Sequence, residues 1–159
     1  MHRPMRTGRD WLAIAATAFL AANLLHGIDH ARQGTERLTT EVRIGGILLT
    51  VLAIVTLIVV LRRSGRAPLV ATVVGFSTAI NVSAAHIAPH WSALSNSYPQ
   101  IHADGLAWAV MLLEVATAFL LGVVGVHGLR ARARSAHDEA LTGGLERPAP
   151  RRTSALPQP

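Results

Sequence analysis

The sequence predicts an all-α, polytopic integral membrane protein with four transmembrane helices. Four apolar runs alternate with polar segments, and each run is long enough to cross a hydrocarbon core. Only 15% of the 159 residues are charged, whereas a soluble domain carries about 25%. The runs are solidly apolar rather than alternating, which favours helices over a β-barrel. The predicted spans cover residues 11–30, 44–61, 67–88 and 105–129.

Each span has local signals at its ends. The first follows a polar N-terminal segment, residues 1–10, and opens at Trp11, an aromatic residue suited to the membrane interface. A cleaved signal peptide is the alternative, but the high total apolar content favours a retained helix. Pro68 suits the first turn of the third helix, and Pro89 ends it because the residue before a proline avoids the α region. Asp104 is a good N-cap for the fourth helix.

The arginines predict the orientation of the transmembrane domain, residues 11–130. Three precede it, three lie in the turn 62–66 and six lie at its C-terminal end and in the tail that follows (residues 130–159), whereas the loop 89–103 has none. The remaining three lie in the loop 31–43 beside two glutamates. Because cytoplasmic segments carry excess arginine, both termini are predicted to be cytoplasmic, in the plasma membrane. The basic charge is then a topology signal, so no nucleic-acid partner is expected, and the polar tail is predicted to be disordered.

The composition excludes several chemistries. The chain has no cysteine and no lysine, which excludes disulfides, thiolate metal sites and lysine Schiff bases. It also lacks a G-x-S-x-G nucleophile elbow, an H-E-x-x-H zinc-protease motif and the phosphate-binding glycine patterns. The sequence therefore names no reaction, and its likeness to small bacterial four-span membrane proteins is architectural.

Two segments with paired histidines are the main candidates for a functional site. His26 and His30 end the first span, and His86 and His90 end the third, four residues apart in each pair. Residues at this spacing share one face of a helix. The two helices run in the same direction, so both pairs are predicted at similar depth near the outer boundary, although the proline before His90 weakens its alignment. His102, just before the fourth span, joins them there.

This cluster predicts a metal or haem site. Imidazole is a good ligand for zinc, copper and iron, and the outer carboxylates Asp29 and Asp104 could orient the ligating rings. Two histidines on facing helices could instead hold haem b, with Gly27, Gly45 and Gly46 leaving room for a flat ring. The alternatives are proton handling and interfacial histidines with no role.

Three polar residues lie inside the predicted spans. Glu114 is about 15 Å below the outer end of the fourth helix, close to the midplane. An ionisable residue there usually faces the bundle interior, either as a proton relay or as a glutamic acid hydrogen-bonded to Asn81 or Thr50. Asn23 and Asn81 are expected to form hydrogen bonds between helices.

The leading hypothesis is a membrane protein with a metal or haem site at the extracytoplasmic face, serving redox chemistry or metal handling. Its expected ligands are His26, His30 and His86, followed by His90 and His102. A second hypothesis is a small proton-coupled transporter that uses Glu114. A third is an accessory subunit of a larger membrane complex. Besides the lipid bilayer, the exposed faces of only four helices predict a homo-oligomer or a complex partner.

Overall fold

The computed structural model describes residues 8–34 and 38–145. Within this part of the chain there are five helices and no strand: α1 Gly8–Gln33, α2 Thr40–Leu61, α3 Ala67–His86, α4 Tyr98–Ile101 and α5 Gly105–Leu145. All except α4 are long and apolar enough to cross a membrane. The prediction of an all-α protein with four membrane-spanning helices is confirmed.

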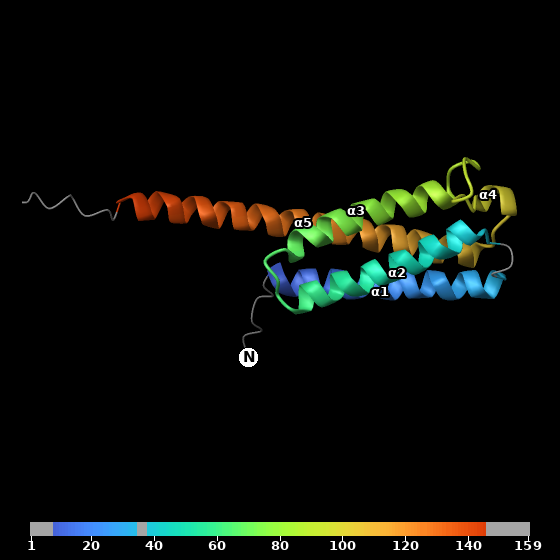
Figure 1. Ribbon diagram of the computed structural model, residues 1–159, viewed down its shortest axis with the longest axis horizontal. Coiled ribbons are helices and arrows are strands. Elements are labelled where there is room, and N and C mark those ends of the chain that lie inside the picture. The colour runs from blue at the N-terminus through green and yellow to red at the C-terminus, as the bar shows by residue number, and fades with distance from the viewer. Residues whose placement is uncertain (1–7, 35–37, 146–159) are drawn as a thin grey trace, which may run out of the picture. The chain divides into compact units, whose positions relative to one another are not determined.

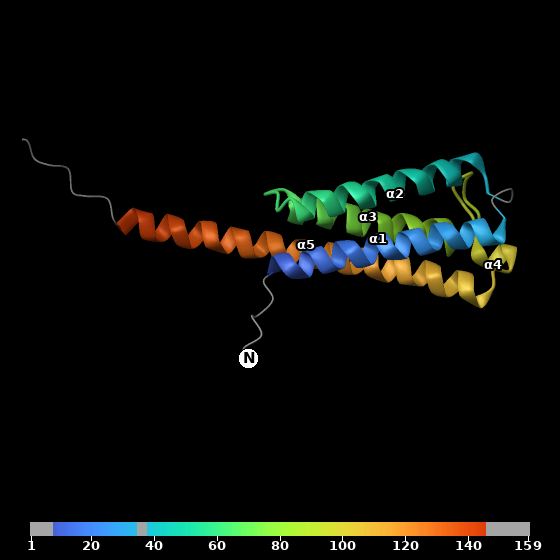
Figure 2. The same cartoon turned by 90° about the horizontal axis from the view of Figure 1, so that it is seen from below.

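The described residues up to Leu129 form one compact unit, a bundle of four helices. In this unit α1, α2, α3 and the first part of α5 lie side by side (Figures 1 and 2). The short helix α4 and the loop after α3 lie at one end, and the turn between α2 and α3 lies at the other (Figure 1). The chain therefore brings the end of α1, the end of α3 and the start of α5 together.

Side-chain caps define two of the helix starts. The Thr39 hydroxyl accepts a hydrogen bond from the Val42 amide at 3.2 Å, so α2 begins earlier than the predicted residue 44. The Asp104 carboxylate accepts from the Ala107 amide at 2.8 Å and caps α5, as the sequence suggests. Helix α3 has a proline in its first turn and ends at His86, before the predicted residue 88.

Residues from Arg130 onward form a second unit. Its described part is the last stretch of α5, which continues to Leu145. Alanine, arginine and leucine are strong helix formers, and a polar composition without proline lets the helix continue. The predicted disorder of 146–159 and the N-terminal residues 1–7 fall outside the described residues.

Glycines allow α3 and α5 to approach closely. A Cβ on Gly75 would lie 2.4 Å from the backbone nitrogen of Gly122, and one on Gly125 would lie 2.5 Å from the Thr72 hydroxyl. Real side-chain atoms do not tolerate such distances. Small residues at these positions therefore set the separation of the two helices, as is common between membrane helices.

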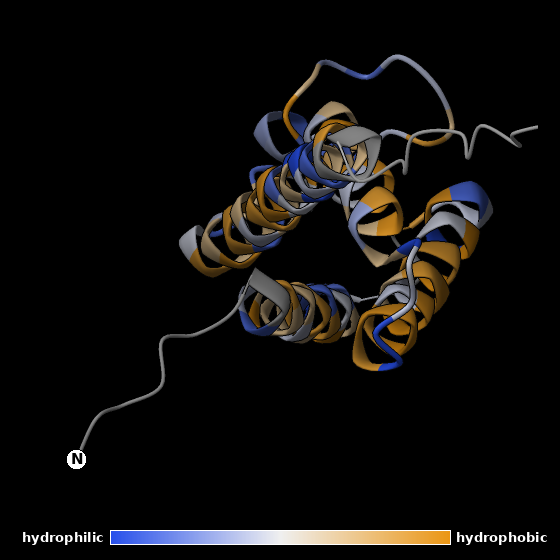
Figure 3. Cartoon of the chain, turned by 90° about the vertical axis from the view of Figure 1, so that its left-hand side faces the viewer, coloured by the Kyte–Doolittle hydropathy of each residue, from blue (hydrophilic) through white to orange (hydrophobic). Residues whose placement is uncertain are grey.

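The interior of the bundle is built largely from small side chains, and large apolar side chains face outward. Phe19, Met111 and Leu121 are the largest fully buried apolar side chains. Apolar residues run along the helices seen end-on in Figure 3, and α2 exposes the most: Ile44, Ile47, Leu48, Val51, Leu52, Ile54, Val55, Ile58 and Leu61. An apolar surface of this extent is consistent with contact to a lipid bilayer.

Candidate metal centre

Three of the predicted ligands converge between α1 and α3. His26 and His30 lie on α1, and His86 is the last residue of α3. The ring centroids are 4.6 Å apart for His26 and His30, 5.0 Å for His26 and His86, and 5.3 Å for His30 and His86. One nitrogen from each ring lies within 4.8 Å of the others. This histidine triad (His26, His30 and His86) could hold a metal ion.

The spacing of the triad needs only a small adjustment for metal binding. Three nitrogens that share one ion at about 2.0–2.1 Å lie roughly 3.3 Å from one another in tetrahedral geometry. The nitrogens of the triad lie within 4.8 Å, so small side-chain rotations bring them to that distance. His26 and His86 are buried and His30 is half-buried.

Hydrogen bonds to outer groups orient two of the three rings. The Nδ1 of His26 is hydrogen-bonded to the Glu114 carboxylate, and the Nδ1 of His86 donates to the backbone oxygen of Asn96 at 3.1 Å. Ligating histidines usually donate their other ring nitrogen to a carboxylate or a carbonyl in this way. In both rings the Nε2 is therefore the nitrogen left for an ion.

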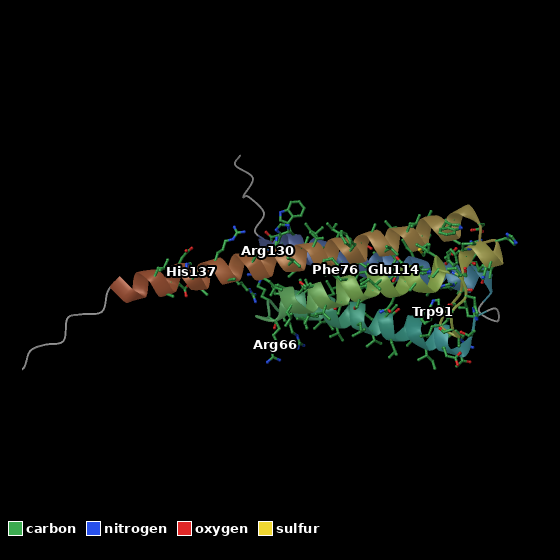
Figure 4. All side chains as sticks on the ribbon, turned by 90° about the horizontal axis from the view of Figure 1, so that it is seen from above. Arg66, Phe76, Trp91, Glu114, Arg130 and His137 are labelled. Carbon is green, nitrogen blue, oxygen red and sulfur yellow. The ribbon has the colours of Figure 1, made fainter. Side chains whose placement is uncertain are left out.

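Glu114 is the carboxylate that serves the triad. It is 1% exposed, and the Asn23 amide donates to its Oε1 at 2.8 Å while His26 engages its Oε2. The Thr50 hydroxyl donates in turn to Asn23 at 2.8 Å. Figure 4 shows Glu114 among the helices of the bundle. The hydrogen-bonded chain of Thr50, Asn23, Glu114 and His26 links α2, α5 and α1.

The sequence did not reveal that Glu114 and the histidines share one site. It placed the histidines near the outer boundary and Glu114 near the midplane. In the structure α1 runs to Gln33, past its predicted end at residue 30. At roughly 1.5 Å per residue, His26 therefore lies about 10 Å inside the end of α1. Glu114 lies about 14 Å from the start of α5 by the same measure, so the two reach similar depths.

Tyr98 is a fourth group at the triad, and it was missed. Its side chain is fully buried, its hydroxyl lies 3.2 Å from the Nε2 of His26, and its ring centroid lies 4.6 Å from that of His86. Burial raises the pKa of Tyr98, against a hydrogen bond from Gln33 that lowers it. A tyrosine in a loop is an ordinary interfacial anchor, and only the fold of the loop shows that α4 turns it inward.

The two acidic residues expected beside the histidines have other partners. Asp29 accepts from Arg32 at 2.8 Å and from Gln33 at 2.6 Å, and Asp104 accepts from Arg32 at 3.0 and 2.9 Å. The Ala107 amide and the Arg32 guanidinium hold the pKa of Asp104 below its usual value. These contacts connect the end of α1 to the start of α5, next to the triad.

The remaining predicted residues lie apart from the triad. His90 is exposed in the loop after α3, where the helix has already ended. His102 is exposed at the end of α4, with φ 50°, and lines a cavity of about 280 Å³ together with His30, Gln33 and Asn96. Asn81, which the sequence suggested as a partner of Glu114, is exposed on α3. The asparagine that donates to Glu114 is Asn23.

Comparison of the chain with protein-family models, with curated proteins and with solved structures gave no match. The chemistry of the centre is therefore read from its own residues: three imidazoles, a buried carboxylate and a buried phenol within contact of one another.

Proposed function

We propose that this protein is a membrane metalloprotein that binds one transition-metal ion through His26, His30 and His86. The observation that carries the proposal is the convergence of three imidazoles from α1 and α3 with their nitrogens within 4.8 Å. The outer hydrogen bonds to Glu114 and to the Asn96 carbonyl support it, because they occupy the Nδ1 of two rings and leave the lone pair of each Nε2 for an ion.

The arrangement favours a single ion over haem. Two histidines that hold a haem iron lie on opposite faces of a flat ring, whereas the triad rings pack against one another at 4.6 to 5.3 Å. The glycines that the sequence associated with a flat ring border open space and do not pack against the triad. A Cβ on Gly27, Gly45 or Gly46 would meet nothing within 4 Å. Imidazole ligands suit zinc, copper and iron ions.

The role that fits this site is metal handling, or redox chemistry with copper or iron. Three histidines leave one coordination position for another ligand, as catalytic zinc sites do. The cavity lined by His30 adjoins the triad on the polar end of the bundle and offers a route for an ion. The contact of Glu114 with His26 favours a supporting role for this carboxylate at the metal over a separate proton path through the membrane.

The proposed location is the extracytoplasmic face of the plasma membrane. The triad lies towards the end of the bundle that holds α4. The turn 62–66, with three arginines, is at the opposite end, and Figure 4 shows Arg66 there, away from Trp91. Arginine-rich turns are retained in the cytoplasm, which supports this orientation.

The test is the metal content of the purified full-length protein. Elemental analysis of protein extracted from its native membrane is expected to find one transition-metal ion per chain. His26→Ala and His86→Ala should lose the ion, and a chelator should lower the melting temperature of the wild type, because an ion bound only to the folded state stabilises it.

His90→Ala is the matched control, since it removes an exposed imidazole from the same end of the bundle. It should retain the ion and its chelator-sensitive melting temperature. Folded wild-type protein that takes up no transition metal would contradict the proposal, as would equal loss of the ion in His90→Ala.

A further inference from the structure

Tyr98 gives the candidate metal centre an oxygen donor. The phenol approaches the side of the triad at which an ion would bind, because its hydroxyl lies 3.2 Å from the Nε2 of His26. This is the nitrogen of His26 that Glu114 leaves open. We propose that Tyr98 is the fourth ligand of the ion, as a phenolate, and that the ion is Fe(III) or Cu(II). This inference rests on the proposed function and adds the class of metal.

Binding of an ion to His26 would remove the hydrogen-bond acceptor of the Tyr98 hydroxyl and favour loss of its proton. Without an ion, the phenol can donate its proton to the Nε2 of His26. An ion on that nitrogen removes the acceptor, and a fully buried donor with no acceptor is unfavourable. Coordination resolves this, because it replaces the phenol O–H bond by an oxygen–metal bond. The proton passes to solvent by way of the cavity lined by His30 and Gln33.

The surroundings of Tyr98 fix the position of its oxygen beside the triad. Gln33 hydrogen-bonds the phenol oxygen, and this donor remains after the proton has left. The ring is held by His86 on one side, at 4.6 Å between centroids, and edge-on by Trp108 at 5.5 Å. The oxygen is therefore positioned by packing and does not need to be recruited from solvent.

The ligand set also selects the metal. Tyrosine is an established ligand of ferric haem iron, and oxygen donors suit harder ions than thiolates do. The divalent or trivalent charge is offset by the two anions that reach the centre, the Glu114 carboxylate and the Tyr98 phenolate. A buried cation near compensating charge is far less costly than an isolated one. Fe(III) and Cu(II) combine a need for such donors with affinity for imidazole.

The absorption spectrum of the metal-loaded protein can test this role of Tyr98. Tyr98 is the only tyrosine and the chain has no cysteine, so a visible charge-transfer band from a protein phenolate or thiolate can arise only at Tyr98. The full-length protein in detergent micelles is loaded with Cu(II) or Fe(III), and bound metal and visible absorption are measured together. Protein grown with ring-deuterated tyrosine is then compared by resonance Raman spectroscopy.

The expected result is one ion per chain with a visible band whose Raman modes shift on deuteration. Tyr98→Phe should lose the band while keeping metal on the triad, and Trp108→Phe, which alters the packing of Tyr98 but no oxygen, should keep both. The isotope experiment uses unsubstituted protein, so the test does not depend on the folding of a variant.

Each other outcome is decisive. Bound Cu(II) or Fe(III) without a tyrosine-dependent band would overturn the role of Tyr98 and leave the triad as the metal site. Zinc as the ion of the native protein would overturn the assigned metal class. No binding of any of these ions by the wild type would overturn the proposed function and this inference with it.

Discussion

Glu114 receives hydrogen bonds from two residues of α1, one at each carboxylate oxygen. Asn23 donates to Oε1 and His26 engages Oε2. Two fixed partners leave the carboxylate little freedom to rotate, and they hold the imidazole of His26 in one orientation. At the scale of single residues, Glu114 is thus a positioning residue for His26, one of the proposed metal ligands.

Glu114→Gln is expected to weaken metal binding by about 10–100-fold, which is the usual effect of removing an outer hydrogen-bond partner. The amide of glutamine cannot accept at both positions, so either Asn23 or His26 loses its acceptor. Competition with a chromophoric chelator measures the affinity. Glu41→Gln is the control, because Glu41 is an exposed carboxylate on α2. Unchanged affinity in Glu114→Gln would show that the carboxylate does not orient the ligand.

Asp104 gives a prediction for pH. Its pKa is lower in the folded protein, because the Ala107 amide and Arg32 stabilise its charged form. The stabilisation is present above the unfolded pKa of about 3.9 and is lost as the pH falls through the folded pKa. Asp104→Asn keeps an N-cap but loses the pair with Arg32.

The Asp104→Asn variant should therefore melt slightly below the wild type at neutral pH, and the difference should close in acid. The effect is small because Asp104 is exposed and its charge is screened. Circular dichroism melts in detergent at the two pH values measure it. Asp104→Ala, which also lacks the cap, should remain less stable at both. A difference between Asp104→Asn and wild type that persists in acid would exclude the ion pair as its cause.

At the scale of helices, the contact between α3 and α5 depends on glycine. These two helices carry His86 and Glu114, and their separation is set where Gly75 meets Gly122. Any increase in that separation would also move Glu114 relative to the triad. Helix packing and site geometry are coupled through this contact.

Gly75→Ala should destabilise the bundle by about 1–3 kcal/mol, the usual cost of overpacking. The added Cβ would lie 2.4 Å from the backbone of α5, which cannot move aside as a flexible side chain can. Unfolding in mixed detergent measures the loss. Gly27→Ala, where a Cβ meets nothing within 4 Å, should leave stability unchanged or raise it. Equal behaviour of the two variants would contradict the close packing of α3 and α5.

The helices were predictable, and the loop between α3 and α5 was not. Apolar runs bounded by Pro68 and Asp104 define spans because lipid permits little other than a helix. The triad followed from spacing and from parallel direction. Two contributors from the loop had no such signal. Asn96 acts through its backbone carbonyl, which every residue has, and the inward position of Tyr98 depends on how α4 folds. Predicting that Glu114 meets His26 requires knowing how far α1 and α5 are shifted along their axes relative to each other. The spacing of residues in the sequence does not give that shift.

At the scale of the whole molecule, the arginine-rich turn and the histidine triad lie towards opposite ends of the bundle. The arginine-rich turn 62–66 lies at one end, and α4 with the neighbouring triad lies towards the other (Figure 1).

A reporter fused after Pro159 is expected to read as cytoplasmic, and a reporter inserted beside the exposed Leu94 is expected to read as extracytoplasmic. The reason is retention of arginine-rich segments on the cytoplasmic side. Paired alkaline phosphatase and fluorescent-protein fusions measure both positions. An extracytoplasmic signal after Pro159 would invert the orientation and place the triad on the inner face.

The Thr50 hydroxyl on α2 lies 2.8 Å from the Asn23 oxygen and 3.0 Å from the Gly46 carbonyl, and when its single proton goes to Asn23 it sets which way that amide faces. It donates to the oxygen of Asn23, which leaves the Asn23 nitrogen to donate to Glu114. If that hydroxyl were absent, the amide could turn over and present its oxygen to the Glu114 carboxylate, and the hydrogen bond between Asn23 and Glu114 would be lost. A hydroxyl on α2 thus sets the direction of the hydrogen-bonded chain that ends at His26 on α1, two contacts away from the imidazole that it orients.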